Sequence, residues 1–312
     1  MEFCVTNLCN NRCVMCTNSA EFSDPKNSQG YEFDQLIERI GQRAEKLLKT
    51  REPINITGGE PTIVPHFVKL LNWLRKNFPR NEIVCVSNGR MFSYEDFAKQ
   101  VLRVDNLKLE IAFHGHTPRL YDEISGVKGG FPQTVQGVKN ILRFRNDSHL
   151  IEIRTVIIRQ NHKKLDEILG FVHKNFKGLD TVVLIFHELE GQCGDHLDKV
   201  VVSYKDIEKE VIRNIEKWSE KIDDLRLYHF PLCVLPPKLW PHTWRTLPPR
   251  EVSFPDECAK CLYRKYCMGV HNDYRHIVGD EEFNSIAAKV PLRTSRGQEF
   301  VYHPIVGIDD KS

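Results

Sequence analysis

The sequence lacks several features that mark whole classes of protein. It has no run of about 18 or more apolar residues, which a membrane-spanning helix would need. Its N-terminus shows no positively charged segment followed by an apolar run, the pattern of a secretory signal peptide. It has no basic cluster, and its 44 Lys and Arg nearly balance its 42 Asp and Glu. We therefore expect neither a membrane nor a nucleic acid among its partners.

The composition is that of a soluble globular protein, with 41% hydrophobic and 28% charged residues in 312. This length is sufficient for one large domain and a smaller one. Ten residues are cysteine: three lie in the first loop, four lie between residues 233 and 267, and Cys4, Cys85 and Cys193 remain. Without an export signal, clustered cysteines are more typical of metal ligands than of disulfides. We therefore expect a reducing cytoplasm as the location.

The first cluster consists of Cys9, Cys13 and Cys16, at C-x3-C-x2-C spacing. It directly follows a short apolar run, Phe3 and Val5, which is typical of a strand. Three thiolates on one loop can bind three irons of a four-iron cluster and leave the fourth iron open. An open metal position is where substrate chemistry takes place. The alternative is a zinc-binding loop.

Strands and helices alternate after this loop. We predict further strands at 53–57, 82–87, 107–113, 150–158 and 181–187, and helices at 33–50, 66–78, 94–102, 131–145, 162–176 and 204–222. Such alternation indicates right-handed crossovers and a parallel sheet, hence an α/β fold. Glycine-rich and polar loops follow the strands at their carboxyl ends, where barrel enzymes build active sites.

Two of these strand ends and the interior of one strand carry candidate binding residues. The second strand runs into Gly58-Gly59-Glu60, in which glycines permit close approach of the backbone and Glu60 can accept hydrogen bonds from an ammonium group. A tight turn with a solvated Glu60 is the alternative. Ser87 and Asn88 end the third strand. Arg154, among apolar neighbours in the fifth strand, is predicted to be a buried cation that needs a carboxylate partner, with Glu110 and Glu152 as candidates.

The alternation stops near residue 225, so we predict two domains, 1–224 and 225–312. Residues 225–230 are predicted to form one more strand, and many prolines then exclude a regular helix or a central strand. Four cysteines lie in this part: Cys233, Cys258, Cys261 and Cys267. Four thiolates are a full set for a closed iron–sulfur cluster or for a Cys4 zinc site.

The C-x3-C-x2-C loop and the following Gly-Gly-Glu together resemble the radical S-adenosylmethionine (SAM) superfamily. The resemblance implies a partial (βα)6 barrel with a [4Fe-4S] cluster on Cys9, Cys13 and Cys16. It implies that the open iron binds SAM, that Gly58, Gly59 and Glu60 contact the SAM amino group, and that Ser87 and Asn88 contribute further cofactor contacts. By the same analogy, Arg154 would contact the SAM carboxylate. Reductive cleavage would then yield a 5′-deoxyadenosyl radical that abstracts hydrogen from a substrate.

The C-x2-C-x5-C array of the second cysteine cluster resembles the SPASM and twitch extensions of radical peptide maturases. In those extensions a fourth cysteine follows after three residues, whereas this sequence has His271. The resemblance implies one auxiliary cluster on Cys233, Cys258, Cys261 and Cys267, with His271 as an outside candidate ligand.

Five stretches, 86–92, 130–142, 152–160, 232–241 and 258–267, resemble the C-type radical SAM maturase of the His-Xaa-Ser peptide system. This implies a ribosomally made precursor peptide as substrate, an external electron donor, and a second maturase as partner. We expect no separate leader-binding domain before residue 3, so precursor recognition would fall to a partner or to the barrel. Cys193 is a candidate substrate-side thiol, with a loop cysteine of no special role as the alternative.

Two competing hypotheses remain open from the sequence. A radical SAM enzyme acting on a small molecule would keep the same cofactors and change only the substrate. A zinc-binding scaffold without turnover would use the same cysteines for structure alone.

Overall fold

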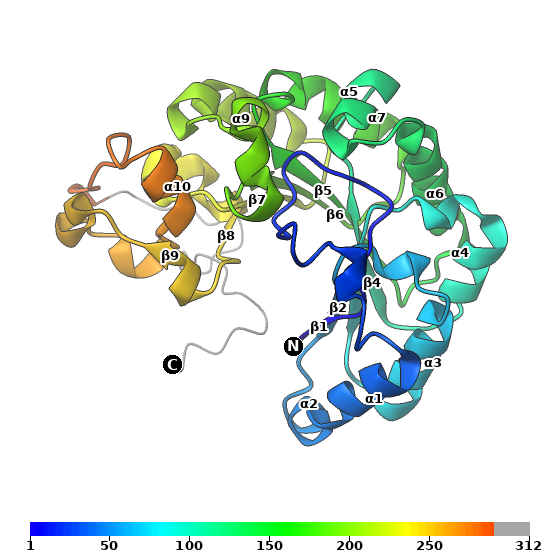
Figure 1. The fold of residues 1–312 in the computed structure, drawn as a ribbon. Helices are drawn as coiled ribbons and strands as arrows, with labels where there is room; N and C mark the ends of the chain where they lie inside the picture. The colour runs from blue at the N-terminus through cyan, green and yellow to red at the C-terminus, as the bar shows by residue number, and fades with distance from the viewer. Residues whose placement is uncertain (290–312) are drawn as a thin grey trace.

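A curved sheet of eight parallel strands forms the centre of the computed structural model, which describes residues 1–289 (Figure 1). The strands are β1 (Glu2–Cys4), β2 (Ile54–Thr57), β3 (Ile83–Ser87), β4 (Leu107–Ala112), β5 (Leu150–Ile157), β6 (Thr181–Phe186), β7 (Leu225–Tyr228) and β8 (Thr243–Trp244). Each strand pairs in parallel with the next along the chain; Phe3, for example, lies opposite Ile56. Among the described residues β1 and β8 do not pair, so the sheet is an open barrel. The predicted α/β fold with a parallel sheet is confirmed.

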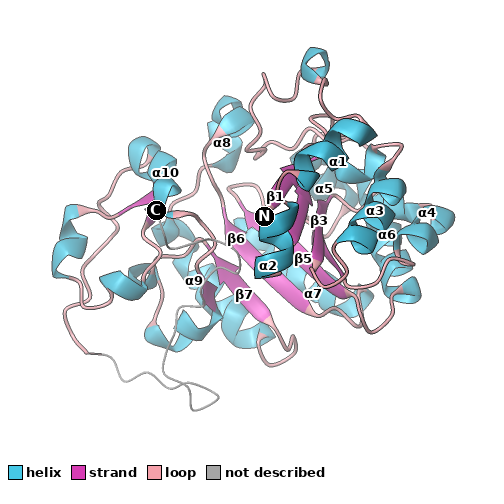
Figure 2. Ribbon diagram, turned by 90° about the horizontal axis from the view of Figure 1, so that it is seen from below, coloured by secondary structure: helices cyan, strands magenta, loops and turns pink. Residues whose placement is uncertain are grey.

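Most of the helices surround the outer face of this sheet (Figures 1 and 2). The helices of the described residues are α1 (Phe33–Gly41), α2 (Ala44–Thr50), α3 (Phe67–Asn77), α4 (Glu95–Val101), α5 (Pro118–Ser125), α6 (Gly130–Phe144), α7 (Leu165–Asn175), α8 (Leu197–Val200), α9 (Tyr204–Trp218) and α10 (Asn272–Ile277). A short antiparallel pair, β9 (Val252–Ser253) and β10 (Val270–His271), lies with α10 in the C-terminal part, on the β7 side of the sheet. No helix of residues 1–289 combines the length and the apolarity needed to cross a membrane.

Strand β4 shows how the sequence separates the core from the interior of the barrel. Leu107, Leu109 and Ile111 are at most 1% exposed and belong to the hydrophobic core. The alternate residues Lys108 and Glu110 line the central cavity instead, because successive side chains of a strand point to opposite faces. The sheet therefore buries apolar side chains outward, under the helices, and presents charged side chains inward.

The sheet extends beyond the predicted six-stranded barrel. The predicted strand at 225–230 is present as β7, and it pairs in parallel with β6, so the boundary predicted after residue 224 falls inside this sheet. Strand β8 lies within the proline-rich stretch and was not predicted, because two residues are too few to give a periodic pattern. Its edge position agrees with the exclusion of a central strand there.

Two helix predictions were wrong in detail. The predicted helix 33–50 is divided into α1 and α2, since the chain leaves helical geometry at Arg43, shortly after Gly41, a residue with low helix propensity. Helix α5 was not predicted at all. Its start and end signals were nevertheless present, with Thr117 accepting a capping hydrogen bond before Pro118 and Gly126 ending the helix in the left-handed region. Residues 290–312, the end of the predicted second domain, lie outside the described residues.

Arg75 organises the end of the barrel opposite the carboxyl ends of the strands. Its guanidinium group donates to five backbone carbonyl groups, those of Phe78, Pro79, Asn81, Asp105 and Asn106, at 2.9–3.1 Å. These carbonyls belong to the turns that lead into β3 and β4. One planar cation with five donors therefore holds two turns together, which a lysine ammonium group cannot do.

We predict that Arg75→Lys lowers the free energy of unfolding by about 2 kcal/mol, because several half-buried carbonyl groups lose a charged donor. Urea denaturation monitored by circular dichroism measures this change. Arg80→Lys, at a nearby exposed position, is the matched control and should stay within about 0.5 kcal/mol of wild type. Equal losses in the two variants would contradict the role assigned to Arg75.

Candidate active site

A cavity of about 1130 Å³ lies inside the open barrel. Most of the residues proposed from the sequence as cluster or cofactor contacts line it: Cys9, Cys13, Cys16, Gly59, Glu60, Ser87, Asn88 and Arg154. They come from the first loop and from the carboxyl ends or interiors of β2, β3 and β5. The structure therefore brings these separate sequence motifs to one place.

The cysteine loop between β1 and α1 is fixed by hydrogen bonds to the loop that follows β2. Gly59 N–H donates to Thr6 O and Glu60 N–H donates to Leu8 O, each at 2.8 Å. In the other direction, the Asn18 side chain donates to Gly58 O at 3.2 Å. The Gly-Gly-Glu motif thus forms the support on which the cysteine loop rests.

The two glycines of this motif allow an approach that no side chain would permit. A Cβ atom on Gly58 would lie 2.2 Å from Thr6 O, and one on Gly59 would lie 2.1 Å from Leu8 O. Gly58 also has φ of +132°, a value that L side chains rarely adopt. The sequence predicted close approach to a ligand at this motif, and the structure shows close approach to the cysteine loop.

Two residues from the loop after β3 hold the middle of the cysteine loop. The Asn88 side chain donates to Asn10 Oδ1 at 2.6 Å. Arg90 donates to Asn11 Oδ1 at 2.9 Å and to Gln133 Oε1 at 2.7 Å, and it also contacts Asn10 O. Arg90 was not singled out from the sequence; its place directly after Ser87-Asn88-Gly89, at a strand end, was the available signal.

Glu60 is 1% exposed, and both its carboxylate oxygens accept hydrogen bonds. Oε1 accepts from Thr62 N–H, from the Thr62 hydroxyl and from the Ser87 hydroxyl, whereas Oε2 accepts only from Asn88 N–H at 2.6 Å. Burial raises the pKa of Glu60, although these hydrogen bonds oppose the shift. A cation beside Oε2 would stabilise the ionised form, so the geometry suits the predicted contact with an ammonium group.

Arg154 belongs to a four-residue charge network in the cavity. It pairs with Glu110 at 2.7 Å and with Glu152 at 2.5 Å, and Lys108 pairs with the same two carboxylates at 2.9 and 2.8 Å. Two cations and two anions therefore alternate in this network. The sequence had named both glutamates as alternative partners of Arg154, and its contact with the cofactor stays a prediction.

Comparison with protein families identifies this arrangement. The family model described as "Radical SAM superfamily" matches residues 3–172, which include the cysteine loop and strands β2 to β5. The chain belongs to the radical SAM superfamily. The first cysteine cluster and the Gly-Gly-Glu motif, which carried the resemblance in the sequence, both lie within the matched region.

Relatives within the superfamily differ in what they act on. The chain is 26% identical over 155 residues to a GTP 3′,8-cyclase from Petrotoga mobilis, covering 50% of this chain and 46% of that protein. It is 27% identical over 163 residues to the mycofactocin maturase MftC from Mycobacterium tuberculosis, covering 52% of this chain and 39% of that protein. The chain thus matches less than half the length of these curated relatives.

A solved structure supports the fold of this radical SAM protein. SuiB from Streptococcus suis, bound to S-adenosylmethionine, superposes with a TM-score of 0.56 at 14% sequence identity. The match covers 72% of this chain and 50% of SuiB. SuiB has also been solved bound to its precursor peptide SuiA.

Cys193 does not reach the cavity of this superfamily member. Its side chain is 0% exposed, and its thiol donates to Glu188 O at 3.5 Å. Its backbone N–H donates to Cys16 O at 3.1 Å. Because a fully buried thiol cannot contact a substrate, the structure does not support Cys193 as a substrate-side thiol. Cys193 instead helps to hold the end of the cysteine loop in place.

The four C-terminal cysteines, Cys233, Cys258, Cys261 and Cys267, line one small pocket. Backbone N–H groups point at three of their sulfur atoms. Leu232 donates to Cys267 and Ile286 donates to Cys261, both at 3.4 Å, and Asn284 donates to Cys233. Hydrogen bonds to the sulfurs are a recurring feature of iron–sulfur sites. The structure therefore brings the predicted ligand set together.

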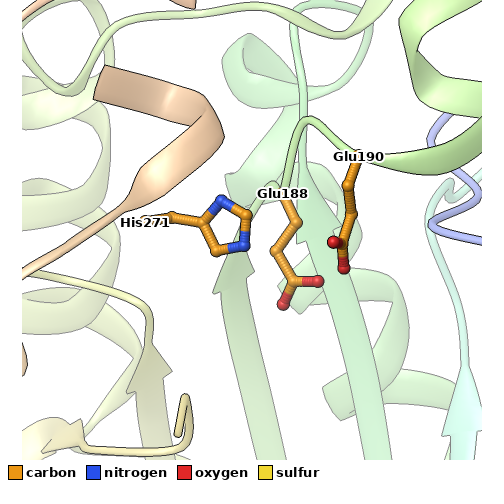
Figure 3. A group of neighbouring side chains, drawn as sticks. All are labelled: Glu188, Glu190 and His271. Atoms are coloured by element: carbon orange, nitrogen blue, oxygen red, sulfur yellow. The ribbon is translucent and has the colours of Figure 1, made fainter. Parts of the chain in front are cut away.

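His271 does not belong to this pocket. It points instead toward Glu188 and Glu190, in the loop after β6 (Figure 3). The structure therefore does not bring this outside candidate ligand to the cysteines.

The spacing of the sulfur atoms bears on what each cysteine set can bind. Within residues 1–289, only Glu188, Glu190 and His271 form a group of three potential ligands whose atoms all lie within 4.8 Å of one another. Neither cysteine set is that compact. A single tetrahedral zinc would draw sulfurs to about 3.8 Å from each other, because each Zn–S bond is about 2.3 Å. A wider spacing suits a cluster, in which each thiolate binds a different iron.

We predict that Gly59→Ala lowers the iron bound per chain after anaerobic reconstitution by up to about four, because its Cβ would displace Leu8 and the adjacent cysteine loop. Gly194→Ala is the matched control, since a Cβ there meets no atom within 4 Å. Colorimetric iron and sulfide analysis measures the effect. Wild-type iron in Gly59→Ala would show that the close contact does not position the loop.

Proposed function

We propose that this chain reductively cleaves S-adenosylmethionine and uses the resulting 5′-deoxyadenosyl radical to modify a ribosomally made peptide. The observation that carries the proposal is the convergence of Cys9, Cys13 and Cys16 with Glu60 on one large cavity. The cysteines lie beside the glycine-rich support of their loop, and the rest of the cavity extends toward β8. A cofactor bound at the cysteines would therefore have space for a substrate next to it.

The residues present fit a four-iron cluster. The three sulfurs share one loop and one cavity, and they are not packed around the position of a single ion. Burial, followed by the charges of Cys9 and Cys16, raises the pKa of Cys13 to about 12, so its thiolate needs a bound metal to form at neutral pH. When bound, the cluster supplies the electron that cleaves the sulfonium of S-adenosylmethionine. Glu60 Oε2 would hold the amino group of that cofactor.

The cavity has room for a substrate beside the cofactor. Its volume of about 1130 Å³ lies near the upper end of the range of about 300–1000 Å³ that is usual for small-molecule pockets. One relative is named a mycofactocin maturase, and SuiB has been solved with a precursor peptide. We propose the same substrate class here, and more specifically a His-Xaa-Ser precursor. An external electron donor and a second maturase or leader-binding partner would complete the system.

We also propose an auxiliary iron–sulfur cluster on Cys233, Cys258, Cys261 and Cys267. Their convergence, their backbone N–H donors and their spacing support a multi-iron group over a zinc ion. Burial, followed by the charge of Cys267, raises the pKa of Cys233 to about 12, so here too the metal would have to drive deprotonation.

A small-molecule substrate is the second candidate. The observation in its favour is the similarity to a GTP 3′,8-cyclase, at an identity close to that of the maturase. Both candidates use the same cofactors, so only a substrate assay separates them.

We predict that Cys13→Ala abolishes formation of 5′-deoxyadenosine, because the first cluster loses a ligand. The assay combines anaerobic protein, dithionite, S-adenosylmethionine and a synthetic peptide with His-Xaa-Ser repeats, and mass spectrometry follows nucleoside and peptide. Wild type and the control Cys85→Ala, at a buried position outside both cysteine sets, should form 5′-deoxyadenosine and change the peptide mass. Cleavage without any change in the peptide would favour the small-molecule alternative. Cleavage retained in Cys13→Ala, or zinc without iron in wild type, would overturn the radical SAM assignment.

We predict that Cys261→Ala removes roughly four irons per chain and leaves cleavage of S-adenosylmethionine detectable, because the second pocket is separate from the first. Iron analysis and the 5′-deoxyadenosine assay on the same sample measure both effects. Unchanged iron in Cys261→Ala would exclude Cys261 as a ligand, and one zinc per chain in wild type would assign the second pocket a structural role.

A further inference from the structure

A compact group of metal-binding side chains lies apart from both cysteine sets. Glu188 and Glu190 come from the loop after β6, and His271 comes from β10, more than 80 residues later in the sequence. One ligand atom from each of the three lies within 4.8 Å of the other two. Figure 3 shows the imidazole directed toward Glu188, with Glu190 beside it. Two segments far apart in the sequence therefore bring potential metal ligands together.

His271 gives the strongest indication of a bound ion in this group. It is 4% exposed, and neither of its ring nitrogens has a hydrogen-bond partner among the described residues. Buried polar groups in native proteins almost always have a partner, and leaving one unpaired costs free energy. The nearest groups it points to are the two carboxylates, which are close enough to share an ion with it. A bound cation would satisfy the imidazole.

A positive charge would also stabilise the ionised forms of Glu188 and Glu190. Burial raises the pKa of Glu188, and burial together with the charge of Glu188 raises the pKa of Glu190. Glu251 and Asp273 add further negative charge around them. Neighbouring carboxylates in such a place repel each other unless a proton or a cation lies between them.

His229 contacts the carboxylate of Glu188. Its Nδ1 lies 3.0 Å from Phe186 O and 3.3 Å from Glu188 Oε1. Burial lowers the pKa of His229 to about 4, so the ring is neutral at physiological pH. His229 also adopts φ of +67°, an uncommon conformation for a residue with a side chain. Such an outer partner orients a metal-binding carboxylate.

We propose that Glu188, Glu190 and His271 bind one divalent transition-metal ion at the rim of the central cavity. Two carboxylate oxygens and one imidazole nitrogen suit manganese, iron or zinc. Bonds of about 2.1 Å would require the three side chains to close in slightly from their present separation. Glu188 is the member of this group that lines the central cavity, so an ion bound to it would lie next to the space for a substrate. The ion would bind a carbonyl or carboxylate group of that substrate.

The test uses Mn²⁺ as the probe, because this hard cation avoids thiolates and reports on the oxygen and nitrogen ligands. Protein with both cysteine sets loaded with iron is titrated with Mn²⁺ at room temperature, and electron paramagnetic resonance follows the free ion. We expect one ion to bind per chain, and Glu190→Gln, which keeps the shape of the side chain, to weaken binding about tenfold or more. His271→Ala should weaken it to a similar extent, and excess Zn²⁺ should displace the bound Mn²⁺.

Two control variants test whether the loss of Mn²⁺ binding is specific to this site. Glu281→Gln and His276→Ala change the same residue types at exposed positions of the same C-terminal part, and they should bind Mn²⁺ like wild type. Equal binding in wild type and Glu190→Gln, or no saturable binding in wild type, would overturn the proposal. The readout is independent of turnover, so failure of the proposed peptide chemistry would leave it intact.

Discussion

The close packing of the cysteine loop against glycines is the constraint on which the rest of the site depends. Beyond Gly58 and Gly59, a Cβ on Gly126 would lie 2.2 Å from Arg12 O, and one on Gly191 would lie 2.1 Å from Thr17 O. Four glycines thus leave the space that four backbone carbonyl groups of the cysteine loop occupy. Because backbone packs directly on backbone, no side-chain rotation can loosen the arrangement. The sulfur atoms of the loop are therefore placed by the barrel as a whole.

The cavity has a network of paired charges in its interior and adjacent carboxylates near its rim. Lys108, Glu110, Glu152 and Arg154 pair with one another in the wall of the cavity. The rim, by contrast, carries adjacent carboxylates at Glu188 and Glu190. A substrate in the cavity would lie between the paired charges of this network and the proposed cation site at Glu188 and Glu190.

Local sequence patterns predicted much of the fold and of the site. They could not predict the contacts between loops that are distant in the sequence. Strand–helix alternation predicted the parallel sheet, and cysteine spacing predicted both groups that the structure brings together. Nothing near Gly126 or Gly191 indicated that each would meet the cysteine loop, because those contacts arise only when the barrel closes around it. His271 was assigned to the second cysteine set from its spacing after Cys267, but spacing does not give the direction of the side chain, which points toward Glu188.

The glycine contacts also bear on the order in which the molecule assembles. The cysteine loop is synthesised before its supports, which come from the loop after β2, from the end of α5 and from the turn after β6. Contacts between residues so far apart in sequence form late, because a long stretch of chain must be ordered before they are made. We therefore expect the loop to stay unstructured until most of the barrel has folded. Iron would then enter a nearly complete protein, and a chain halted before β6 would lack the means to retain it.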